Sequence, residues 1–265
     1  MNKILLTQKG IEYKLDKNIE YEYNNDLINK LKIKVLGNTK LELVIKDFEE
    51  IKLNIEFEVL DNVKFDVYEV KKNIKAKILN NYKLNLNSII NITKVYDINT
   101  INEKNIVNLN GNKSKVNFIL KTVSKNLEKY DILINHNALY TESDVITNGL
   151  NTTGNLYFTV STLVPNGIKN CVANQQNRII NLTDKECNIK PNLLIEEVDV
   201  TANHSALIGG FKDEEIFYMQ RLGLSKEVAS KLLIEGFLKS KISNKLATNF
   251  KKYWRWIWIV MIFCY

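Results

Sequence analysis

Short segments in which apolar and polar residues alternate fill most of the chain between residues 31 and 200. The clearest runs from Ile51 through Leu53, Ile55 and Phe57, which are separated by lysine, asparagine and glutamate. A period of two places apolar side chains on one face of a β-strand and polar side chains on the other. Similar segments occur at residues 31–36, 41–45, 64–70, 74–79, 84–86, 116–120, 132–134 and 156–163. The pattern predicts a mainly β protein with Ile, Val, Leu and Phe pointing inward and Lys, Glu and Asn outward.

The strands recur about every ten residues, a spacing typical of a β-sandwich, a β-barrel or a β-helix. The breaks between them are Asn, Asp and Gly clusters, which tolerate the dihedral angles of turns. Candidates for hairpin turns are Asn110-Gly111, Asn148-Gly149 and Asn166-Gly167. Because no fixed repeat motif emerges, the periodicity alone does not choose among the three architectures.

The composition changes at Lys212. Residues 213–222 predict a short helix with acids in its first turn, where the helix dipole favours them, and Gly223 is the predicted end. Ser225 is the predicted N-cap of a second helix. Its apolar stripe is expected to comprise Val228, Leu232, Leu233, Gly236 and Phe237. We therefore divide the chain into a β-body (1–210), a helical part (211–250) and an apolar tail (251–265).

The tail holds all three tryptophans, and its apolar run of about a dozen residues is short of the roughly 20 that a membrane-spanning helix needs. We interpret it as a buried strand or an atypical end left by a reading-frame change; a membrane-surface anchor is the alternative. The N-terminus lacks the apolar run of a signal peptide. The three cysteines form neither a disulfide framework nor a CxxC zinc signature. These features predict a cytoplasmic protein.

Composition excludes several classes of function. Hydrophobic residues make up 45% of the chain, which excludes wholesale disorder. The net charge of +7 comes from dispersed lysines, so we expect no nucleic-acid partner.

Residues 111–114 resemble the last part of a phosphate-binding loop, but the earlier glycine that completes the backbone cradle is missing. We therefore interpret these residues as a turn.

The chain has two histidines, His136 and His204. His204 follows Glu197 and Asp199 closely, at the point where the last strand ends and the helical part begins. Imidazole and carboxylate together are acceptable ligands for iron. The alternative is that both acids are solvated and that His204 only caps a turn.

Several segments resemble the core domain of the SufB/SufD family, in the family's order. Residues 191–225 are similar to the end of that domain, and residues 226–238 match its helix that ends in Glu-Gly-Phe. Upstream, residues 135–145 resemble its "His-x-Ala-x-x-Thr-x-Ser" segment, and residues 175–182 its "Gln-x-Asn-Arg-x-Leu-Leu" strand. The resemblance implies a right-handed parallel β-helix with a small C-terminal helical part. Family members are scaffold subunits that work with the SufC ATPase in iron–sulfur cluster assembly.

By this resemblance His204 occupies the position of the family's histidine after the last strand. The position implies a role in cluster assembly at a subunit interface, with the imidazole as a candidate iron ligand. Ala202 stands where many SufD-type members have a cysteine. Lys185 stands where SufB-type members have one, with Cys187 as a weak substitute, and Ser205 replaces the SufB-type glutamate. These departures favour SufD over SufB.

The resemblance implies a SufD-like short form that is a scaffold and not an enzyme. It would pair with a SufB-like paralogue through its last strands, with His204, Glu197 and Asp199 at the interface. It would dock a SufC-like ATPase through Phe217, Leu232 and Phe237. No cofactor is expected to be stably bound, although a transient iron–sulfur cluster is compatible with the SufB–SufD interface. The alternatives are a self-sufficient SufB-type scaffold, a carbohydrate-active β-helix enzyme, which would need paired acids on one outer face, and a membrane-associated adaptor.

Overall fold

The computed structural model describes residues 1–24 and 29–241. The described residues form fifteen strands and two helices. The strands are β1 (Asn2–Thr7), β2 (Gly10–Lys14), β3 (Ile19–Tyr23), β4 (Lys30–Val35), β5 (Thr39–Val59), β6 (Lys64–Leu84), β7 (Ile89–Asp97), β8 (Thr100–Leu109), β9 (Lys115–Ser124), β10 (Leu127–His136), β11 (Glu142–Asn151), β12 (Asn155–Val164), β13 (Cys171–Asn181), β14 (Cys187–Ile195) and β15 (Val200–Gly209). The helices are α1 (Asp213–Arg221) and α2 (Lys226–Lys239).

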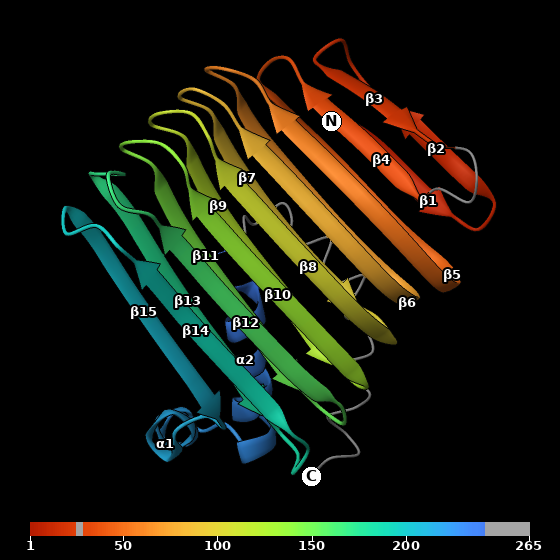
Figure 1. The fold of residues 1–265 in the computed structure, drawn as a ribbon. Helices are drawn as coiled ribbons and strands as arrows, with labels where there is room; N and C mark the ends of the chain where they lie inside the picture. Colours follow the sequence, from red (N-terminus) through yellow and green to blue (C-terminus); the bar gives the residue numbers. More distant parts are fainter. Residues whose placement is uncertain (25–28, 242–265) are drawn as a thin grey trace.

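The strands wind into a parallel β-solenoid of about seven turns (Figure 1). Each coil contributes one strand to each of two facing sheets, which we call the odd and even sheets. The odd sheet continues from β6 through β7, β9, β11, β13 and β15, and the even sheet through β8, β10, β12 and β14. β5 and β6 are long enough to pass through both sheets. The architecture confirms the β-helix and removes the sandwich and the barrel.

The hairpin prediction was wrong. Antiparallel pairing among the described strands is confined to the N-terminal end, where β1 pairs with β2 and β3 with β4. Asn148 and Gly149 lie within β11, where a Cβ on Gly149 would stand 2.3 Å from Leu156 Cδ2. Gly111 lies at a corner between coils, where a Cβ would stand 2.1 Å from the backbone nitrogen of Leu86. Both glycines are required by close packing and not by a hairpin turn.

The alternation correctly predicts the apolar interior. Phe57 and Tyr82 stack inside the solenoid with ring centroids 4.8 Å apart, and both are essentially fully buried. The prediction that charged residues point outward is wrong for several of them, and four of these form one group. Glu69, Lys71 and Lys94 occupy inward positions of the odd sheet, and Glu103 an inward position of the even sheet; all four are buried. We call these four residues the interior charge cluster.

The interior charge cluster is stable because each charge has two partners of opposite sign. Lys71 Nζ lies 2.8 Å from Glu69 Oε2 and 3.0 Å from Glu103 Oε2. Lys94 Nζ lies 2.9 Å from each of the same two carboxylates. Tyr82 donates a further hydrogen bond of 2.7 Å to Glu69. Buried charges are tolerated only with pairing and hydrogen bonding of this kind.

The end of α1 and the start of α2 lie where the sequence predicts them. Gly223 has a φ of +85°, a left-handed conformation that favours glycine after a helix. Ser225 Oγ accepts a 3.3 Å hydrogen bond from the Val228 backbone, as an N-cap does. The predicted apolar stripe was wrong in part, because Val228 and Leu232 are each 43% exposed. The buried side chains of α2 are Ala229, Ser230, Ile234, Phe237 and Leu238, a face selected by contact with the odd sheet.

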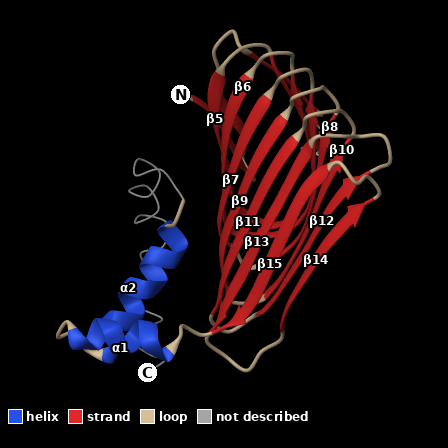
Figure 2. Ribbon diagram, turned by 90° about the vertical axis from the view of Figure 1, so that its left-hand side faces the viewer, coloured by secondary structure: helices blue, strands red, loops and turns tan. Residues whose placement is uncertain are grey.

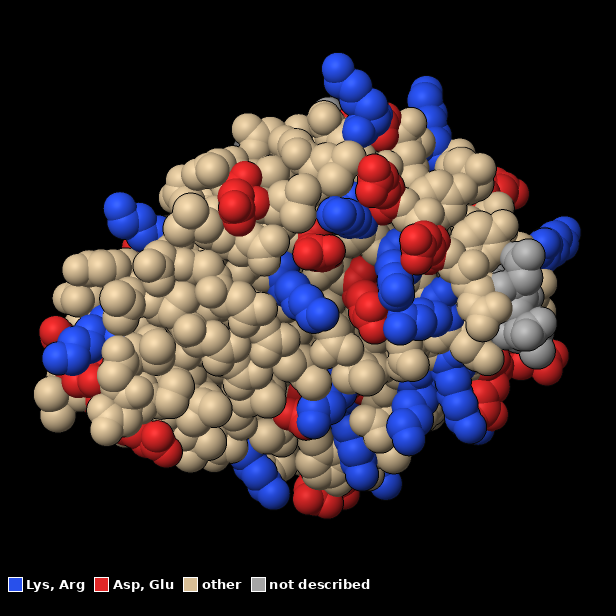
Figure 3. All heavy atoms as spheres, turned by 45° about the horizontal axis from the view of Figure 1, so that its top comes forward, with Lys and Arg blue, Asp and Glu red and all other residues tan. Residues whose placement is uncertain are grey.

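Figure 2 shows the helices on the outer side of the odd sheet, near the C-terminal coils. Among the described residues, no helix is long and apolar enough to cross a membrane. The tail predicted at residues 251–265 lies outside the described residues. On the face viewed in Figure 3, Lys and Arg side chains are interspersed with Asp and Glu and gather over the N-terminal coils. This face therefore presents no single-sign patch of the kind that binds nucleic acid.

Candidate functional site

The C-terminal end of the solenoid is open. β14 and β15 each pair with one neighbouring strand, and no further coil of the described chain covers them. The inward residues of β15 therefore lie at the surface. Ile208 is 42% exposed, whereas its register partner on β13, Ile179, is fully buried. We call the exposed inward row of β15 the open end.

His204 belongs to this inward row. It is exposed and lies opposite Gln175 of β13 in the parallel register, with Ala202 two positions earlier on the same face. Gln175 is buried and bridges the two sheets: its amide nitrogen donates to Thr162 Oγ1 at 2.9 Å and to the Asn192 carbonyl at 3.2 Å. The imidazole makes no hydrogen bond with the described residues. It is available to a partner or a metal ion at the mouth of the solenoid.

Glu197 and Asp199 form the turn between β14 and β15. The Glu197 carboxylate accepts backbone hydrogen bonds from Gly167 at 3.0 Å and from Val198 at 2.9 Å. These bonds, that from Gly167 first, lower the pKa of Glu197. The Asp199 carbonyl accepts from the Asn170 backbone at 2.7 Å. Both residues therefore have a structural role in the turn.

The structure does not gather the three predicted interface residues into one cluster. His204 lies five residues beyond Asp199 along β15, which corresponds to about 16 Å of extended strand. Within residues 1–24 and 29–241, no group of three His, Cys, Asp or Glu side chains is placed to hold a metal ion. A metal role for His204 stays a prediction that needs ligands beyond the described residues.

The three residues predicted to dock an ATPase occupy different environments. Phe217 on α1 is 61% exposed and Leu232 on α2 is 43% exposed, whereas Phe237 is 9% exposed and packs against the odd sheet. Phe237 therefore anchors α2 to the β-body. We call the exposed large apolar side chains of the two helices the helix patch; they are Phe217, Tyr218, Leu222, Val228 and Leu232.

Sequence reasoning missed two groups of residues. The interior charge cluster places charges where the alternation of β6 calls for apolar residues: Glu69 and Lys71 continue the inward row of Phe65 and Val67. That break in the alternation was the available signal. Lys121 and Asn148 were also missed. Both donate to the Phe237 carbonyl, at 3.4 Å and 3.3 Å, and so hold the C-terminal end of α2 on the sheet. No local sequence pattern predicts these contacts, because they join residues about 90 or more positions apart.

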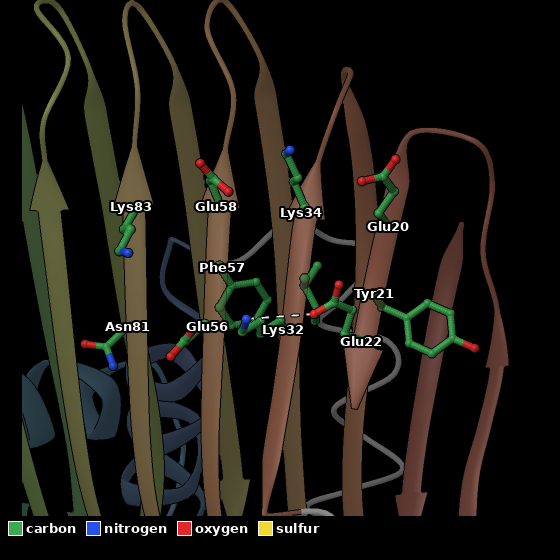
Figure 4. A pocket seen from close by; sticks show the side chains of 11 residues that line it. Glu20, Tyr21, Glu22, Lys32, Lys34, Glu56, Phe57, Glu58, Asn81 and Lys83 are labelled. Carbon is green, nitrogen blue, oxygen red and sulfur yellow. Dashed lines mark ion pairs between the residues drawn. The ribbon is translucent and has the colours of Figure 1, made fainter. Parts of the chain in front are cut away.

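A cavity of about 300 Å³ lies over the even sheet at the N-terminal end (Figure 4). Its carboxylates alternate with lysines across neighbouring strands. Glu22 lies opposite Lys32, which lies opposite Glu56, and Glu56 Oε1 stands 2.9 Å from Lys30 Nζ. A second row parallel to the first contains Glu20, Lys34, Glu58 and Lys83. Such cross-strand charge pairs stabilise a sheet, and they differ from the paired acids that glycoside hydrolysis needs.

Comparisons with known proteins agree on one family. The sequence profile described as "SUF system FeS cluster assembly, SufBD core domain" matches residues 48–237. The iron–sulfur cluster assembly protein SufD of Bacillus subtilis is 25% identical over 163 residues, which are 61% of this chain and 35% of that protein. A SufBD family protein of Pyrococcus horikoshii is 37% identical over 51 residues, 19% of this chain and 11% of its own. The chain thus aligns with about a third of the Bacillus relative.

Proposed function

Because the chain belongs to the SufB/SufD core-domain family of the SUF iron–sulfur cluster assembly system, we propose that it is a SufD-like scaffold subunit. In this proposal it pairs with a SufB-like paralogue through the open end and docks a SufC-like ATPase on the helix patch. The chemistry of cluster assembly and of ATP hydrolysis lies with the partners. A cluster is bound only transiently at the shared interface, and the complex works in the cytoplasm.

The observation that carries the proposal is the exposure of the inward row of β15. A solenoid that ends without a covering coil leaves apolar side chains and unpaired backbone groups at a sheet edge, which is a template for pairing with another chain. Ile208 is half-exposed at this edge. His204 lies in the same row, so a partner that covers the open end also encloses the imidazole.

The test mixes the chain with a SufB-like paralogue and separates the mixture by size-exclusion chromatography. Light scattering then measures the mass of the complex, which reports pairing. Ile208→Lys places a charge in the open end, and we expect it to weaken pairing at least tenfold, since a buried unpaired charge costs several kcal/mol. The control is Leu86→Lys, at a residue that is 47% exposed in a corner far from the open end. Equal pairing by both variants would place the interface elsewhere. Pairing absent from the unmodified chain, combined with a cluster retained by the chain alone, would favour a SufB-type scaffold.

Docking of the ATPase is tested on the helix patch. We expect Phe217→Asp and Leu232→Asp to reduce co-purification with a SufC-like ATPase without lowering the thermal midpoint, because both side chains are exposed. Tyr13→Asp, at a side chain 56% exposed at the other end of the solenoid, is the control. Undiminished co-purification of the two helix variants would remove the helix patch from the docking site.

A further inference from the structure

One row of residues crosses the outer face of the odd sheet beneath α2. Lys121 on β9 lies opposite Asn148 on β11, which lies opposite Arg178 on β13. Arg178 in turn lies opposite Leu207 on β15. Since neighbouring strands are about 4.8 Å apart, two cationic side chains stand roughly 10 Å apart on one face.

The Phe237 ring stands between these two cations. Lys121 Nζ lies 5.8 Å from the ring centroid, and Arg178 Cζ lies 5.5 Å from it. Arg178 Cζ also lies 5.8 Å from the Phe211 ring. The guanidinium is therefore oriented by two aromatic contacts, which attract a cation but leave its hydrogen-bond donors unused.

The two cations differ in what they bind. The Lys121 ammonium donates to Ser240 Oγ at 3.0 Å and to the Phe237 carbonyl at 3.4 Å. Arg178 forms no hydrogen bond or ion pair with the residues that the structure describes, and its Nε is buried without an acceptor. A buried donor left unpaired costs about 1–3 kcal/mol, so Arg178 is a group that an external acceptor would stabilise.

Arg178 lines a groove of about 560 Å³ between the helices and the last strands of the odd sheet. Lys241 also lines it and donates to Gln176 Oε1 at 3.2 Å. The carboxylate among the lining residues belongs to Glu215, which accepts a 2.9 Å bond from the Lys212 backbone at the start of α1. Burial, and secondly the charge of Lys241, lower the pKa of Lys121 to about 7.

We propose that this groove binds the oxyanion group of a small molecule, a carboxylate or a phosphate, between Arg178 and Lys241. A guanidinium binds either group through two parallel N–H···O bonds, and an amine adds a point charge. The Ser205 hydroxyl supplies a neutral donor along the groove, and Phe211 and Leu207 offer apolar surface to the rest of the ligand. The volume lies in the usual range for a small-molecule site. The proposal is independent of the SUF partners.

The experiment is calorimetric titration of the full 265-residue chain with inorganic phosphate and, separately, with succinate, at constant ionic strength. The variants are Arg178→Gln and Lys241→Gln. The control is Lys190→Gln, which removes the same charge from an exposed position on β14 of the other sheet. Lys241 is exposed, so its variant keeps the test valid if Arg178→Gln unfolds the chain. The stronger of the two probes identifies the class of oxyanion.

We expect binding of at least one probe, weakened about tenfold or more by Arg178→Gln, because a hydrogen bond to a charged group contributes roughly 1.5–3 kcal/mol. Lys241→Gln should weaken it severalfold, and Lys190→Gln should leave it unchanged. No heat of binding with either probe, or equal weakening by all three variants, would overturn the proposal.

Discussion

Ile179 and Ile208 are register partners on adjacent strands of one sheet, yet Ile179 is fully buried and Ile208 is 42% exposed. The difference arises because β15 has no following coil among the described residues. The two isoleucines occupy equivalent inward positions, so the difference in their exposure measures how much burial a following coil provides.

The first prediction concerns this pair. Ile179→Ala should lower the free energy of unfolding by about 2–5 kcal/mol, since it leaves a cavity in the core. Ile208→Ala should cost less than about 1 kcal/mol in the isolated chain. Chemical denaturation measures both. When the partner subunit is bound, the cost of Ile208→Ala should rise; a large cost in the isolated chain would mean that the open end is already covered.

The second prediction concerns Lys94 in the interior charge cluster. Lys94→Met leaves the carboxylates of Glu69 and Glu103 with too little positive charge, and should cost about 3–5 kcal/mol of stability. Lys77→Met, at an exposed outward position of β6, is the control and should change stability by less than about 0.5 kcal/mol. Equal effects of the two substitutions would contradict the inward placement of Lys94.

The cluster also has a pH signature. Burial raises the pKa of Glu69, but attraction by Lys71 and Lys94 outweighs that effect, and the net pKa falls to about 2 from an ordinary 4.5. A carboxyl whose pKa is lower in the folded state stabilises the protein above its unfolded pKa. This contribution should be present at pH 5 and should disappear as the pH falls from about 4.5 to 2. A denaturation series across that range should show a smaller acid dependence for Glu69→Gln.

The third prediction concerns Glu128, which titrates in the opposite sense. Burial raises its pKa to about 7, although Oε2 accepts hydrogen bonds from Thr122 at 2.6 Å and Tyr130 at 2.8 Å. Stability from a group with a raised pKa is full below the unfolded pKa of 4.5 and is lost as the pH rises through 7. The loss amounts to up to about 3 kcal/mol. Glu128→Gln should therefore be relatively more stable at pH 9 than at pH 5; a constant difference between variant and unmodified chain would refute the assignment.

The fourth prediction concerns His204. Because its side chain is exposed and makes no hydrogen bond with the described residues, His204→Ala should leave the thermal midpoint unchanged. If the imidazole acts at the interface with a SufB-like paralogue, the yield of cluster in the reconstituted complex should fall. A lowered midpoint or a normal yield would assign His204 a structural role. Ala202→Cys is the companion variant: the new thiol would lie in the same inward row, and it should raise the yield if the family's cysteine matters here.

The sequence predicted those features that depend on local pattern. Alternation from Ile51 to Val59 gave the inward apolar row, and Gly223 and Ser225 gave the boundary between the helices. The break in alternation at Glu69 and Lys71 marks charges at inward positions, but their pairing was beyond local pattern, because Lys94 lies opposite Glu69 only once successive coils are in register. Phe237 was predicted to face a partner because the stripe of an amphipathic helix does not say which neighbour it packs on.

The choice between solenoid and sandwich also needed more than periodicity. Both folds bury one face of every strand, so residues such as Leu53 and Val67 satisfy either. The resemblance around His204 selected the solenoid, which the structure confirms. The turn role of Glu197 was hidden because its backbone partner at Gly167 lies 30 residues away.

The most direct test of pairing through the open end is hydrogen–deuterium exchange of the chain alone and in complex with a SufB-like paralogue. β15 is an edge strand that pairs with β13 on one side only. The backbone amides that point away from β13 should therefore exchange rapidly in the isolated chain. On pairing, we predict strong protection of residues 200–209, with little change in β1–β3 at the opposite end. Complex formation that leaves residues 200–209 unprotected, or that protects the N-terminal strands instead, would contradict the account.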